Sequence, residues 1–202
     1  MDISKRTRLA LLVCFISLSS TVNAHSRAHI HIYESATEQT DAEKLSRAVD
    51  YFQSGKFHEA LIWFSKLDSK YKLNPRFQAY MGVCCYYDGE YERAVATLEP
   101  ILTKLNAFAP HELAVYYYCV AESYFRLKKY IDAVPLFEKH TLLCYNNEKG
   151  DSLLRIGMCY KHMRDIENAQ EYFIEALAYY RRYNNQDNVN YIERELKRLA
   201  DN

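Results

Sequence analysis

The stretch Leu153–Ala176, LLRIGMCYKHMRDIENAQEYFIEA, decides the fold of this 202-residue chain. In its first half, apolar or small residues stand at i, i+3, i+4 and i+7 from Leu153, ending at Tyr160. In its second half, the same kind of stripe stands at i, i+4 and i+7 from Ala169. This spacing puts each set on one face of a helix with 3.6 residues per turn. The stretch therefore predicts two amphipathic helices joined by a tight turn.

Two small residues mark where these helices should cross. Gly157 and Ala169 lack bulk, so the two backbones can approach closely there. Tyr160 and Phe173 are expected to fill the space on either side of the crossing.

The pattern recurs earlier in the chain. An alanine with a large apolar residue four positions later occurs four times, at spacings of 34, 39 and 36 residues, at Ala60, Ala94, Ala133 and Ala169. A small residue precedes each of these alanines, at Ala48, Gly82, Ala121 and Gly157. Gly55 and Gly89 lie between the two halves, where the first helix must end and a positive φ is usual. One helix pair cannot bury its apolar face alone, so the units are expected to stack into a curved solenoid.

These offsets resemble those of the tetratricopeptide repeat family, whose unit is a 34-residue helix-turn-helix. The resemblance covers about residues 41–182 and implies an all-α, right-handed helical solenoid. Its expected parts are four units at about 41–74, 75–110, 111–149 and 150–186, and a capping helix at 187–202. Thr40 and Glu43 predict a capping box at the start of unit one.

The chain departs from the family pattern at a few positions. Lys128 stands where a turn glycine is usual. Pro100 and Pro135 lie inside second helices and predict that these are shortened or kinked. The 39-residue spacing predicts a lengthened loop or helix end near Lys104–Pro110.

The N-terminal residues have the composition of a signal peptide. Lys5, Arg6 and Arg8 precede the apolar run Leu9–Leu18, which is too short to span a membrane, and small residues favour cleavage after Ala24. We expect a signal peptide over 1–24, a disordered extension over 25–40, and no membrane span in the mature chain. The mature protein is then an exported bacterial protein, periplasmic in a Gram-negative organism and otherwise secreted.

Composition and motifs exclude several functions. The 26 Lys+Arg and 26 Asp+Glu balance to a formal net charge of +0, unlike a nucleic-acid binder with a globally basic surface. No G-x-S-x-G, G-x-x-x-x-G-K-[ST], H-E-x-x-H or G-x-G-x-x-G motif is present. The sequence therefore predicts a protein that is not an enzyme and has no cofactor.

The cysteines follow neither a zinc nor a redox spacing. The predicted mature chain has an odd number of them and no C-x-x-C: Cys84, Cys85, Cys119, Cys144 and Cys159. We expect them to be small buried core residues, although export would permit one disulfide.

The resemblance also implies where a ligand binds, because the first helices of tetratricopeptide units line a concave groove. Carried over position by position, the partner-binding residues are Phe52, Gln53, Arg76, Tyr86, Tyr87, Tyr118, Glu122, Phe125, Arg126, Lys161 and His162. Aromatic residues and arginine carry much of the energy of protein interfaces, so an extended peptide or partner helix is the expected guest. Alternatively, Phe52, Tyr87 and Phe125 belong to the core between units. The Lys and Asn pattern of the family's carboxylate clamp is not reproduced.

Two other functions remain open beside a protein-binding scaffold or adaptor in the cell envelope. His25, His29 and His31 cluster at the expected mature N-terminus and could hold copper or zinc. The array could also be a structural protein that self-associates into a homo-oligomer.

Overall fold

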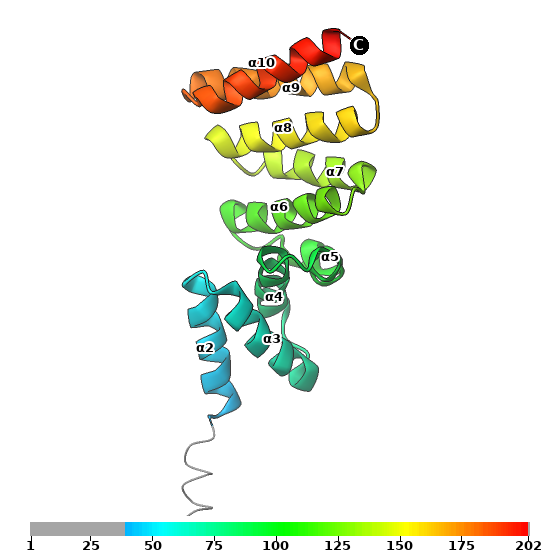
Figure 1. The fold of residues 1–202 in the computed structure, drawn as a ribbon. Helices are drawn as coiled ribbons and strands as arrows, with labels where there is room; N and C mark the ends of the chain where they lie inside the picture. The colour runs from blue at the N-terminus through cyan, green and yellow to red at the C-terminus, as the bar shows by residue number, and fades with distance from the viewer. Residues whose placement is uncertain (1–38, 202) are drawn as a thin grey trace, which may run out of the picture. The chain divides into compact units, whose positions relative to one another are not determined.

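The computed structural model describes residues 39–201, and all regular elements in that range are helical (Figure 1). The chain divides into two units, Met1–Lys44 and Leu45–Asn202; the first turn of α2 belongs to the first unit, and all later helices belong to the second. The predicted signal peptide and residues 25–38 lie outside the described part. In chain order the elements are α2 (Asp41–Gln53), α3 (Phe57–Tyr71), α4 (Pro75–Tyr87), α5 (Tyr91–Leu98), the 3-10 helix η1 (Glu99–Leu105), α6 (Pro110–Arg126), α7 (Tyr130–Thr141), α8 (Asn146–His162), α9 (Ile166–Arg182) and α10 (Gln186–Ala200).

Each helix packs on its neighbours in the chain, as a solenoid requires. Helices α4 with α5, α6 with α7, and α8 with α9 form the pairs of units two, three and four. Successive units meet through α3 with α4, α5 with α6, and α7 with α8, and α4 also contacts α6. Figure 1 shows α6 to α10 following one another in this order. The predicted all-α tetratricopeptide-like solenoid is confirmed.

The helix crossings place a small residue against a large one sixteen positions later. A Cβ built on Gly157 would lie 2.5 Å from Cδ1 of Phe173, and one built on Gly82 would lie 2.4 Å from Cγ of Leu98. In units one and three the buried pairs at the same offset are Ala48 with Phe64 and Ala121 with Phe137. The crossing is thus where the sequence predicts it, but the Phe173 ring lies directly on Gly157 rather than beside it. The missing side chain makes room for the ring.

All five helix-to-helix turns of the repeat type use a left-handed residue. Gly55 and Gly89 have φ of 71° and 82°, and Lys128, Arg164 and Asn184 have φ of 60°, 65° and 56°. In each turn the next residue donates its backbone N–H to the carbonyl five residues earlier, at 2.9 to 3.0 Å. These bonds satisfy carbonyls at the end of the preceding helix. Lys128 therefore replaces the usual glycine without changing the turn.

The two prolines have different effects. Helix α5 ends at Leu98 after eight residues and continues as η1, which carries Pro100 in its first turn. Proline lacks the N–H that an α-helix needs at this point. Helix α7 runs through Pro135 without a break, but its 12 residues are fewer than the 17 of α9. The extra residues of the long spacing form η1 and the connection that leads to α6 at Pro110.

Both ends of the array have the local structure that the sequence predicts. Thr40 donates its backbone N–H to Glu43 Oε2 at 2.8 Å, and Glu43 donates its own to Thr40 Oγ1 at 3.3 Å, which is the expected capping box. Helix α10 begins one residue before the predicted capping helix and packs on α9. Val189, Ile192 and Leu199 are buried in the same cluster as Phe173.

The cysteines in the described part of the chain are all free and buried, as expected. Burial raises the pKa of Cys84 to about 12 and that of Cys85 to about 11. These thiols stay protonated at neutral pH and act as small apolar residues. Within residues 39–201, no helix combines the length and apolar character needed to cross a bilayer.

Candidate binding groove

A pocket of about 190 Å³ lies where the first helices of three units meet. Its lining comes from α4, α6, α8 and the last turn of α7: Tyr87, Val115, Tyr118, Cys119, His140, Glu148 and Asp151. The pocket therefore lies among the first helices, where the resemblance predicts the ligand groove. Tyr87 and Tyr118 are the predicted groove residues that line it.

Two tyrosines form the aromatic wall of the pocket. Tyr87 stacks on Phe57 with ring centroids 4.2 Å apart and planes 9° apart, and is still 58% exposed. Tyr118 is half-buried and meets the ring of Phe137 edge-on at 6.0 Å. Burial raises the pKa of Tyr118, so its phenol is neutral at physiological pH. The pocket is thus lined by one accessible tyrosine ring, that of Tyr87, and by one that packs against the core, that of Tyr118.

The negatively charged groups of the pocket lining are two carboxylates from the first two turns of α8. Glu148 is exposed, and Asp151 is half-buried and accepts a hydrogen bond of 2.5 Å from the hydroxyl of Tyr180. Tyr180 is fully buried on α9, so this bond fixes the position of Asp151 in the array. Neither acid was among the predicted groove residues, because both precede the part of α8 that the family pattern marks.

His140 reaches the pocket from the end of a second helix. Its Nδ1 lies 2.7 Å from Ser152 Oγ and 3.3 Å from Cys144 Sγ. Burial lowers the pKa of His140 to about 4, so the ring is neutral at neutral pH. The sequence contains no signal for this role, since the groove prediction considers first helices alone.

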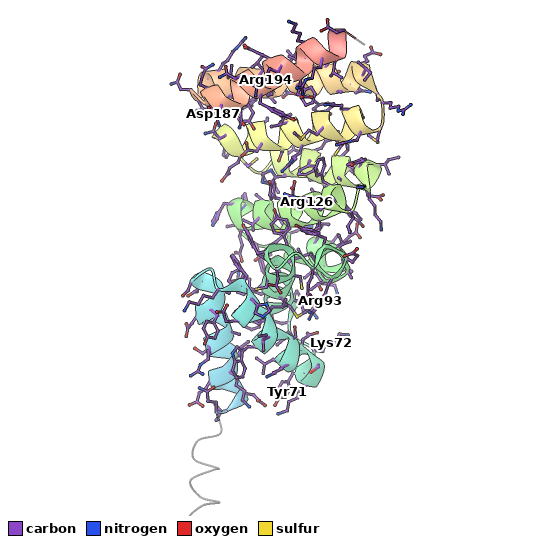
Figure 2. The ribbon with its side chains drawn as sticks, in the orientation of Figure 1. Tyr71, Lys72, Arg93, Arg126, Asp187 and Arg194 are labelled. Atoms are coloured by element: carbon purple, nitrogen blue, oxygen red, sulfur yellow. The ribbon has the colours of Figure 1, made fainter. Side chains whose placement is uncertain are left out.

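A buried carboxylate that is not part of the pocket lining connects α6 with α8. Glu122 is fully buried, and its Oε1 accepts hydrogen bonds from Arg126 Nε at 2.9 Å and from an Arg155 guanidinium nitrogen at 3.0 Å. Its Oε2 lies 2.8 Å from Arg155 Nε, in an ion pair that lacks hydrogen-bond alignment. Arg155 also lies 4.8 Å above the Phe125 ring. Glu122 therefore positions two arginines, and Arg126 is at the C-terminal end of α6 (Figure 2).

The predicted groove residues on α2 and at the start and end of α4 mostly contact aromatic side chains within the array. Phe52 is half-buried and stacks on Tyr80 at 4.4 Å, as in the alternative that assigned it to the core. Gln53 is exposed at the end of α2. The Arg76 guanidinium lies 4.4 Å above the Phe108 ring. Tyr86 is half-buried and has its ring 4.9 Å from that of Tyr87.

The predicted residues at the end of α8 also have partners within the array. Lys161 forms an ion pair with Glu195 of α10. Burial would raise the pKa of Glu195, but Lys161 and Arg198 outweigh it and hold this pKa below its ordinary value. His162 is exposed and stacks on Tyr130 at 4.6 Å. These residues join units and α10 and do not line the pocket.

A metal site is not formed within residues 39–201, where no three His, Cys, Asp or Glu side chains are grouped to hold an ion. The candidate ligands His25, His29 and His31 lie outside the described residues.

Comparison with known proteins agrees with the repeat fold. A model of the tetratricopeptide repeat family matches residues 150–183, the unit formed by α8 and α9. The solved structure of MamA from Desulfovibrio magneticus RS-1 is 17% identical, covers 80% of this chain and 93% of that one, and has a TM-score of 0.55. The apo form of RapI is 14% identical, covers 87% of this chain and 55% of that one, and has a TM-score of 0.61. A search of curated proteins found no sequence match. Residues 150–183 therefore match a tetratricopeptide repeat, and the solved structures share the fold of the described chain.

Proposed function

We propose that this chain is a non-catalytic adaptor that binds an extended segment of another protein along α4, α6 and α8. The tetratricopeptide fold is a protein-interaction scaffold, because stacked repeats present an extended concave surface. The observation that carries the proposal is the pocket at the meeting point of those three first helices. Exposed apolar side chains stand at its edge, with Tyr87 58% and Val115 44% exposed.

The size of the pocket favours a side chain of a polypeptide over a free small molecule. Small-molecule sites usually enclose roughly 300–1,000 Å³. This pocket holds about 190 Å³, which suits a single large side chain. A chain that inserts one residue here can continue along the neighbouring first helices, which supply further contact area.

Site-specific photo-cross-linking tests this function. Benzoylphenylalanine is placed at Val115 on α6 and, as the matched control, at Ile174 on α9, which is an exposed second-helix position. We expect irradiation of the cells that normally make the protein to join Val115, and not Ile174, to one segment of one partner. Equal labelling at both sites, or none at Val115, contradicts the proposal.

A substitution in the pocket provides the second arm of this experiment. Tyr87→Ala should weaken cross-linking at Val115 and lower the melting temperature by no more than a few degrees, because Tyr87 is largely exposed. Tyr87 is a better choice than Arg126, whose removal would leave the buried Glu122 with fewer partners.

The proposal also places the adaptor outside the cytosol, in the periplasm if the organism is a Gram-negative bacterium. Its support is the basic residues Lys5, Arg6 and Arg8 before the apolar run, and the small residues that end at Ala24. We expect mass spectrometry of the native protein to find an N-terminus at His25 in the envelope or medium fraction. A cytosolic protein that retains Met1 to Ala24 contradicts this location.

A further inference from the structure

The lining of the pocket has a charge of one sign. It includes the carboxylates of Glu148 and Asp151, and of the described residues that line it none is Lys or Arg. Burial lowers the pKa of His140 to about 4 and raises the pKa of the Cys119 thiol, so both groups are neutral at pH 7. At neutral pH the charged groups of the lining are therefore two carboxylates.

Two cations of α8 close to the lining in sequence already have partners within the array. Arg155, one turn after Asp151 on α8, is paired with the buried Glu122 and also interacts with the Tyr118 side chain at the edge of the lining. Lys149 follows Glu148 in the chain but lines a different pocket, where it lies 5.3 Å from the centroid of the Tyr179 ring. Asp151 receives its hydrogen bond from a hydroxyl, and among the described residues no ion pair joins it to a Lys or Arg.

The remaining lining suits a long side chain with a cationic end. Val115 and Cys119 offer apolar contact one turn apart on α6. The methylene stems of Lys and Arg pack well on such surfaces while their charged ends reach polar groups. A cation over the face of a tyrosine ring is also attracted to it, and Tyr87 and Tyr118 both line the pocket.

From this lining we infer that the pocket binds a lysine or arginine side chain of the partner segment. The inference rests on the proposed function, because it names the anchor residue of the segment bound there. The charged end lies between Glu148 and Asp151, and the stem lies against Val115 with the tyrosine rings beside it. This guest is opposite in charge to the acidic tails that a carboxylate clamp accepts.

Selection from a random peptide library displayed on phage, with the full chain as bait, tests the inference. We expect the selected peptides to share a Lys or Arg at one position and to cross-link to benzoylphenylalanine at Val115. Replacing that residue by Met, which keeps an unbranched stem without charge, should weaken binding about tenfold or more. Adding salt should weaken the basic peptide more than its Met counterpart.

Two double variants locate the effect in the pocket. Glu148→Gln with Asp151→Asn should remove most of the preference for the basic peptide over the Met peptide. Asn keeps an oxygen that accepts the hydrogen bond from Tyr180, so the fold should be preserved. The matched control is Glu171→Gln with Glu175→Gln, two exposed acids on α9, and it should keep the preference.

The outcomes separate the inference from the proposed function. Peptides that cross-link at Val115 without a shared basic residue, or that bind the Glu148→Gln, Asp151→Asn variant with an unchanged preference, overturn the inference alone. A library that yields no peptide cross-linking at Val115 overturns both. If the pocket variant does not fold, equal salt dependence of the basic and Met peptides on the unaltered chain is the result that overturns the inference.

Discussion

Gly157 shows how a single residue determines the crossing within a unit. The ring of Phe173 occupies the space that a side chain at position 157 would need, since a Cβ built on Gly157 would lie only 2.5 Å from Cδ1 of Phe173. Protein interiors are packed too densely to absorb such an overlap without shifting a helix. The same relation links Gly82 to Leu98, so it is a property of the repeat and not of one unit.

Gly157→Val should therefore reduce the free energy of unfolding by about 1–3 kcal/mol or more through overpacking. Urea denaturation measures the change. Glu171→Val is the control, since it places the same β-branched residue at an exposed position of α9 and should change stability much less. Equal stability of Gly157→Val and the unaltered chain would show that the helices do not cross at this residue.

His140 should make the stability of the fold depend on pH. Its folded-state pKa is about 4, below the ordinary 6.5, because it is buried. Between these values the unfolded chain binds a proton that the folded chain does not, so stability should fall as the pH drops from 6.5 to 4. The groups in contact with the ring are Ser152 Oγ, Cys144 Sγ and the Tyr118 ring. The carboxylates of Glu148 and Asp151 line the same pocket, but burial outweighs them and the pKa of His140 is lowered.

Melting temperatures measured from pH 7 to pH 4 check this expectation. The His140→Gln variant lacks the titrating group and should lose melting temperature less steeply over the same range, whatever its stability at pH 7. The same slope for both proteins would mean that His140 accepts its proton equally well in the folded and unfolded chains.

At the scale of the elements, the turns between paired helices all have the same geometry despite different sequences. A left-handed φ costs a residue with a side chain about 1–2 kcal/mol and costs glycine little. Lys128 has a φ of 60° and Arg164 a φ of 65°, so units three and four have strain that Gly55 and Gly89 avoid. The backbone hydrogen bonds that close each turn hold it in place all the same.

Lys128→Gly should relieve this strain and stabilise the chain by about 0.5–1 kcal/mol, which raises the melting temperature by about 1–4 °C. Thermal denaturation followed by circular dichroism measures the shift. Lys129→Gly is the neighbouring control, and it should not stabilise because Lys129 has a φ of −89°. A lower melting temperature for Lys128→Gly would contradict the expected cost of this turn.

Glu122 connects helices that are not adjacent in the chain. It lies on α6 and pairs with Arg155 on α8, across the intervening α7. Breaking a buried pair by removing one partner leaves the other charge uncompensated, which is usually strongly destabilising. This contact orders the first helices of units three and four, the same two helices that carry most of the pocket lining.

At the scale of the whole described unit, stability arises between neighbours. The buried residues form clusters that each join two consecutive helix pairs, or the last pair and α10, as in the cluster of Leu153, Phe173 and Ile192. In such an array a local defect is felt most by the adjacent repeats and least by distant ones. Helix α10 covers the last apolar face of unit four.

Ile192→Asp should therefore reduce amide protection from hydrogen exchange most in α8 and α9, and much less in α3 and α4. Ile192 is fully buried, whereas Ile174 is 59% exposed, so Ile174→Asp is the matched control and should leave protection nearly unchanged. Hydrogen exchange read by mass spectrometry gives the protection of each helix. An equal loss in every helix would mean that the array unfolds as one cooperative unit.

The repeat, the helix pairing, the turns and the capping helix can all be predicted from the sequence, because they follow from small and large residues at fixed local spacings. The helix crossing at Gly157 and Phe173 and the turn at Gly89 each depend on contacts within a single unit. The pocket became evident only from the packed helices, since periodicity does not separate two adjacent faces of a helix. The burial of Glu122, and the pocket that His140 and Asp151 both line, depend on how separate helices pack, and no local spacing in the sequence encodes this packing.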